Sequence, residues 1–159
     1  MPTITKTQRD ANVNQGSTPY GNLTALRYVL ETNASGAVIG SDSTAAVALG
    51  DIVRIGPLPA GLRFVDSEVI VSTGMSASVT GSLGFAYTDG VDSAAVPQSA
   101  NHFGAALNLA SAARLRNATS NATVTLPKQA WLTLTTAGAN NAKSSRIEVV
   151  IFAIVEGNA

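Results

Sequence analysis

Residues 77–87 read Ala-Ser-Val-Thr-Gly-Ser-Leu-Gly-Phe-Ala-Tyr, and this stretch decides the fold class. Its alternate positions place five side chains on one face: Ala77, Val79, Leu83, Phe85 and Tyr87. The other face carries Ser, Thr, Gly and Ala. Strict alternation with a period of two is typical of an antiparallel strand with one buried face. The glycines within the stretch indicate a β-bulge or a closely packed neighbouring strand.

Further strands, separated by turn residues, are predicted on both sides of this one. They are expected at residues 23–30, 51–56, 62–65, 68–73, 122–126, 131–136 and 146–155. The last of these becomes apolar throughout, which predicts a central strand covered on both faces. About eight strands at a spacing of about ten residues predict an all-β fold, an antiparallel β-sandwich or jelly roll.

Two segments depart from this rhythm. Residues 1–21 are polar and end in a stretch rich in Gly, Pro and Asn, so we expect an extended N-terminal arm. Two alternatives stay open for it: a disordered terminus, which is expected of an isolated monomer, and an arm that orders against a neighbour in an assembly. Residues 22–159 are then the single β-sandwich domain. Residues 101–115 are rich in alanine, which favours a short helix and an irregular loop about equally.

The composition excludes several classes of function. The 159 residues contain ten basic and ten acidic side chains, a net charge of zero, and no cysteine. There is therefore no basic field for nucleic acid, no disulfide scaffold and no cysteine-based metal site, and we expect no direct nucleic-acid partner. A neutral chain also has no electrostatic protection against self-association, which favours a protein that lives in an assembly.

Targeting and membrane segments are not predicted. Residues 1–6 contain no apolar stretch of the kind that opens a secretory signal, so we expect a chain made and kept in a cytoplasm. The longest apolar run, residues 149–155, falls far short of the ~20 residues of a membrane helix, so no membrane partner is expected.

The sequence offers few residues from which a catalytic site could be built. His102 is the only histidine, and Ser99, Asp89 and Asp92 lie near it in sequence, but no Gly-x-Ser-x-Gly elbow accompanies them. The acidic pairs at positions 66/68 and 89/92 fit turn chemistry as well as they fit glycoside hydrolysis or a calcium site. No glycine-rich phosphate-binding motif occurs. We predict a protein that is not an enzyme and binds no cofactor or metal.

Four residues are candidates for a protein interface: Tyr20, Arg114, Arg116 and Trp131. The two arginines are two positions apart, so on a strand they share a face and can clamp a carboxylate or phosphate; the alternative is a solvated loop edge. Trp131 lies on an alternating strand, where an indole anchors a core or an interface.

Residues 49–65 read Leu-Gly-Asp-Ile-Val-Arg-Ile-Gly-Pro-Leu-Pro-Ala-Gly-Leu-Arg-Phe-Val. This strand, corner and second strand resemble a segment common in small structural proteins of tailed bacteriophages. The strand at 78–87, the following Thr-Asp-Gly and the terminal strand at 146–155 extend the likeness over about residues 45–155. Together they resemble the jelly-roll head decoration, or cement, proteins of tailed bacteriophages.

The resemblance implies a non-enzymatic structural virion protein, synthesised in the host cytoplasm. It implies binding to the major capsid protein on the outer capsid surface, as a dimer or trimer, where it stabilises contacts between major capsid subunits. The residues leave two other classes open. A carbohydrate-binding jelly-roll module of a tail or adhesin needs exposed aromatic rings, for which Trp131, Tyr20, Tyr28 and Tyr87 are available, and a small hydrolase would depend on His102.

Overall fold

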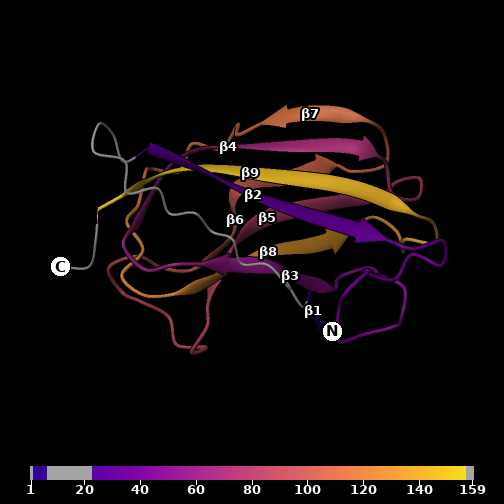
Figure 1. Cartoon of the computed structure of the whole chain (residues 1–159), viewed down its shortest axis with the longest axis horizontal. Coiled ribbons are helices and arrows are strands. Elements are labelled where there is room, and N and C mark those ends of the chain that lie inside the picture. Colours follow the sequence, from indigo (N-terminus) through magenta and orange to yellow (C-terminus); the bar gives the residue numbers. More distant parts are fainter. Residues whose placement is uncertain (1, 7–22, 157–159) are drawn as a thin grey trace.

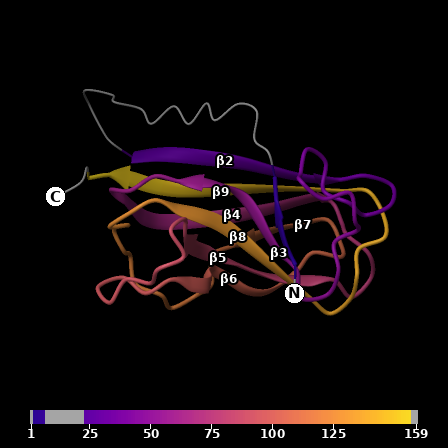
Figure 2. The same ribbon diagram turned by 90° about the horizontal axis from the view of Figure 1, so that it is seen from below.

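The computed structural model describes residues 2–6 and 23–156, which form nine strands in two sheets. The five-stranded sheet has the order β1 (Thr3–Thr5), β3 (Ile52–Leu58), β8 (Ala130–Ala137), β5 (Thr80–Tyr87) and β6 (Ser99–Asn108). The four-stranded sheet has the order β2 (Leu23–Thr32), β9 (Ser145–Val155), β4 (Leu62–Thr73) and β7 (Ala113–Arg116). Figures 1 and 2 show the sheets stacked as two layers. The predicted all-β sandwich of the jelly-roll type is confirmed, with about eight strands expected and nine found.

The core lies between the two sheets and is lined by alternate residues of each strand. On β5, Leu83, Phe85 and Tyr87 are at most 3% exposed, and Val79 just before the strand is equally buried. The predicted alternation is therefore confirmed from residue 79 onward, whereas Ala77 is exposed and precedes the strand. All strand pairs run antiparallel except β1 with β3, which run parallel.

The C-terminal strand β9 is central, as predicted, because it pairs with β2 on one side and β4 on the other. Its inward residues Ile147, Val149 and Ile151 are essentially fully buried. The outward side differs from the prediction, since Phe152 and Ile154 are only half-buried and no third layer of described residues covers them.

The prediction for residues 101–115 is wrong, because this segment forms most of β6 and most of β7 rather than a helix or an irregular loop. The register of β6 against β5 shifts twice, and Ala106 has a φ of 49°. These bulges break the period of two from which a strand is predicted. The pairing with β5 and β4 outweighs the helix propensity of alanine, which is a weak preference.

Two other expectations are corrected. Residues 122–126 form no strand, and Thr125 makes only an isolated bridge to Arg63. The strands predicted separately at 62–65 and 68–73 are one strand, β4, with a bulge between Phe64 and Asp66. The bulge accommodates the Asp-Ser pair that suggested a turn.

Of the predicted arm, residues 1–21, the structure describes residues 2–6, which include β1. Residues 7–21 lie outside the described part, and the proposal that the arm orders against a neighbour stays a prediction. In the described ranges no helix is present that is long and apolar enough to span a membrane.

Candidate interaction surface

Charged residues are distributed very unequally between the two outer faces of the sandwich. The four strands of the β2-β9-β4-β7 sheet carry nine of them: Arg27, Glu31, Arg63, Asp66, Glu68, Arg114, Arg116, Arg146 and Glu148. On β2, β4 and β9 they alternate with buried residues, and on β7 the two arginines alternate with less exposed residues, so all nine face outward. The outward side of this sheet is called the charged face below.

Most charges of the charged face are paired with one another, and Arg63 pairs with Glu156, which follows β9. Arg27 lies 2.7 Å from Glu148, and Arg146 contacts both Glu148 and Glu31. The hydrogen bond from Arg27, together with that from Arg146, lowers the pKa of the Glu148 carboxyl below its ordinary value. Exposed pairs of this kind contribute little to stability because water screens them, so they keep the face solvated more than they hold the fold together.

The predicted interface arginines belong to this charged face. On β7, Arg114 pairs with Glu68 at 3.0 Å and Arg116 pairs with Asp66 at 2.6 Å, and both guanidinium side chains are well exposed. They share one face of a strand, as the two-residue spacing predicts, but their charges are already compensated within the chain.

The outer side of the five-stranded sheet is almost free of charge. Arg54 is the only Lys, Arg, Asp or Glu in the five strands β1, β3, β5, β6 and β8. The outward side of β3, β5 and β8 is called the neutral face below. It is defined by five partly exposed residues, Ile52, Arg54, Ala86, Trp131 and Thr135, and by Thr133, which is buried.

Trp131 and Arg54 are the two large side chains of the neutral face. The Arg54 guanidinium carbon lies 5.9 Å from the centre of the indole ring, which is within the range of a cation–π contact. Ala86 lies opposite Trp131 in the sheet, so nothing bulky stands beside the indole on β5. A depression of about 300 Å³ adjoins this region and is lined in part by Ile52, Ala86 and Thr135.

The neutral face has the composition of the centre of a protein interface. Such centres are depleted in charged residues and enriched in aromatic residues and arginine. Trp131, Arg54 and small uncharged neighbours match that description, whereas the charged face does not. The face is made of residues from three neighbouring strands, which suits contact with another protein surface.

The four predicted interface residues do not form one site. Trp131 lies on the neutral face, and Arg114 and Arg116 lie on the opposite, charged face. Tyr20 lies outside the described residues. Sequence reasoning missed Arg54, although an arginine between two apolar residues of a strand is a signal for an outward position.

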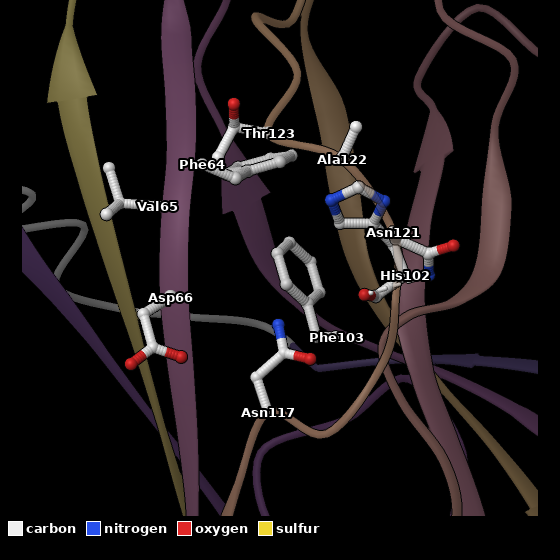
Figure 3. A pocket seen from close by; sticks show the side chains of 9 residues that line it. All are labelled: Phe64, Val65, Asp66, His102, Phe103, Asn117, Asn121, Ala122 and Thr123. Carbon is white, nitrogen blue, oxygen red and sulfur yellow. Dashed lines mark hydrogen bonds between the residues drawn. The ribbon is translucent and has the colours of Figure 1, made fainter.

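His102 lies inside the molecule, on β6, and not in a loop. Figure 3 shows its imidazole beside Phe64 and Phe103, and the ring centres are 5.6 and 5.0 Å apart. Phe85 is a third aromatic neighbour at 5.4 Å. Burial in this aromatic cluster lowers the pKa of His102 below its ordinary value of 6.5 and favours the neutral ring.

The surroundings of His102 do not form a hydrolytic site. The cavity beside it measures about 20 Å³, enough for about one water molecule. Asp89 pairs with Lys128, and Asp92 accepts hydrogen bonds from the backbone of Ser93 and Gln98. These two carboxylates are therefore engaged in their own turn. Among residues 2–6 and 23–156 no three His, Cys, Asp or Glu side chains come together as a metal-binding group.

The described tyrosines are unsuited to stacking on sugars. Tyr28 and Tyr87 are 2% and 3% exposed, and their hydroxyls donate to the backbone oxygens of Pro57 and Val96. Burial raises the pKa of both phenols. Among the described residues that a carbohydrate-binding module could use for stacking, Trp131 is the one that is not buried. Its ring already lies beside Arg54.

Comparison with known proteins identifies the fold. No protein-family model and no curated protein matches the chain. Among solved structures, a chain in the capsid of Ralstonia phage GP4 has a TM-score of 0.65 at 18% identity, over 99% of this chain and 100% of that one. A chain of the cyanophage Pam1 capsid asymmetric unit has a TM-score of 0.57 at 11% identity, over 94% and 97%. This protein therefore has a β-sandwich fold that is also found in phage capsids.

Proposed function

We propose that this chain is a structural, non-enzymatic virion protein that binds the outer surface of a phage capsid and stabilises contacts between major capsid subunits. Two observations support the proposal. The fold is similar to chains of two phage capsids over 99% and 94% of this chain, and one outer face of the sandwich is nearly free of charge. The low charge of that face is the observation that carries the proposal, because the centre of a protein interface is depleted in charged residues and a solvated surface is not.

The neutral face is the surface that we assign to the capsid partner. Docking it buries Trp131 and small neutral residues and desolvates one charge, that of Arg54, which already lies against the indole. Docking the charged face instead would desolvate nine ionic side chains, at a penalty that several paired charges do not recover. The charged face then points to solvent. Copies of the chain associate as a dimer or trimer on the capsid.

Virions of the source phage test this proposal. The chain is expected in purified particles at a fixed ratio to the major capsid protein. Particles lacking it should bind the purified chain up to the same ratio and then withstand a higher temperature before they release DNA. A chain that is absent from particles, and that does not bind particles lacking it, would contradict the proposal.

A further inference from the structure

Residues 2–6 occupy a slot in the body of the protein as an added strand. The slot is formed by β3 on one side and by residues 40–42 on the other, and it is called the N-terminal slot below. Three residues of β1 lie opposite three of β3: Thr3 opposite Ile52, Ile4 opposite Val53 and Thr5 opposite Arg54. On the other side the Thr5 amide donates to Asp42 Oδ1 at 2.9 Å, and the Asp42 amide donates to the Thr5 oxygen at 3.0 Å.

Side chains of the same segment fix its position in the slot. Ile4 points into the core and is 2% exposed. The Lys6 amide donates to the Arg54 oxygen at 3.1 Å, and its ammonium donates to the Val29 oxygen on β2. Main-chain bonds combined with one buried anchor are the means by which sheet edges bind extended peptides.

The partners of residues 2–6 named above are distant in the sequence. The nearest is Val29, 23 residues from Lys6, and the others lie in residues 42–54. The contacts therefore do not require that the strand and the slot belong to one chain. A second copy supplies the same peptide with the same side chains.

The chain between Lys6 and Leu23 is long enough for such an exchange. Sixteen residues, 7–22, separate the two, and fully extended they reach about 55–60 Å. A domain of this size has a radius of gyration of about 15 Å, so its diameter is smaller than that reach. The β1 strand of one copy can therefore enter the slot of a copy that touches it.

We propose that the N-terminal strand is exchanged, with residues 2–6 of one copy filling the N-terminal slot of a second copy. The exchange keeps every contact of the slot and changes only the path of the connecting chain. It is favoured where copies are held at millimolar effective concentration, as neighbours in an assembly are. The inference goes beyond the proposed function, because it requires only copies of this chain and no capsid protein.

Cysteine pairs test the exchange in the purified 159-residue chain, which has no cysteine of its own. Thr5→Cys is introduced in one chain and Arg54→Cys in another, and the two proteins are mixed at about millimolar concentration and oxidised. Neighbouring strands lie about 4.8 Å apart, which a disulfide can bridge. A single chain carrying both substitutions shows that the two positions can be joined.

The matched control is Thr80→Cys mixed with Ala137→Cys. These positions are register partners on β5 and β8, which lie in the interior of the sheet and of the sequence. They cannot be exchanged without unfolding the domain, so a linked dimer in that mixture measures random collision.

Exchange predicts at least about tenfold more disulfide-linked heterodimer in the Thr5/Arg54 mixture than in the control mixture. The proposal is overturned if the doubly substituted chain closes its disulfide within one molecule while the two mixtures give equal amounts of heterodimer. Because the assay contains no capsid, that result leaves the capsid-surface proposal untouched.

Discussion

Gly84 on β5 lies against the backbone of β6 with no room for a side chain, and replacing it by alanine is a sharp test of the fold. A Cβ at this position would lie 2.0 Å from the Ser99 oxygen and 2.4 Å from the Ala100 carbonyl carbon. Both are backbone atoms, so β6 must move away by about 1 Å to reach even a short contact. Overpacking of this size costs about 1–3 kcal/mol, and disturbed pairing of Phe85 with Ser99 adds about 1 kcal/mol.

We therefore expect Gly84→Ala to lower the free energy of unfolding by about 3 kcal/mol, and the melting temperature by about 6–12 °C. Urea denaturation followed by fluorescence of Trp131, the single tryptophan, measures the loss. Gly90→Ala is the control, because its added Cβ meets no atom within 4 Å and the only penalty is a φ of 72°, worth about 1–2 kcal/mol. If Gly84→Ala were no more destabilising than Gly90→Ala, the close approach of β6 to β5 would be wrong.

Two further predictions concern buried polar groups. Because burial lowers the pKa of His102 from 6.5, the unfolded chain takes up the proton first. The free energy of unfolding should therefore fall as the pH drops through 6.5 toward the folded-state pKa of His102. His102→Phe should flatten that decline in urea titrations between about pH 8 and pH 5. An unchanged slope in the variant would refute the role of His102. Asn141 is 1% exposed; its Oδ1 accepts a hydrogen bond from the Ser76 amide, and its Nδ2 donates to Thr32 Oγ1 and to the Lys143 oxygen. Asn141→Ala leaves these buried partners without hydrogen bonds, so it should lower the free energy of unfolding by about 3 kcal/mol. A loss below about 1 kcal/mol in the same urea titration would contradict this network.

Sequence reasoning predicts those parts of the fold whose pattern of apolar residues is clear. Residues 79–87 alternate except at Gly81, residues 146–155 begin by alternating and then become apolar throughout, and both segments form the strands expected of them. β6 could not be predicted in this way, because Gly104 and the left-handed Ala106 shift its register and its alanines carry little preference for a strand. Its conformation is decided by pairing with β5, which is a non-local effect.

The candidate surface could be predicted only in part, for a similar reason. Trp131 was expected to be an anchor, and its outward position on β8 follows from alternation. Its separation from Arg114 and Arg116 follows from the strand order, which no local pattern encodes. The contrast between nine charged residues in one sheet and one in the other becomes visible only once each strand is assigned to its sheet.

Binding of the purified chain to capsids that lack it tests the central claim most directly. Ala86→Glu places a charge beside Trp131 on the neutral face, and Ala25→Glu places the same charge at an exposed position on the other face. Burying an unpaired carboxylate costs several kcal/mol, so Ala86→Glu should weaken binding by about a hundredfold or more, while Ala25→Glu should bind like the parent chain. Equal affinity of the two variants, or a loss confined to Ala25→Glu, would contradict the claim that the neutral face is the docking surface.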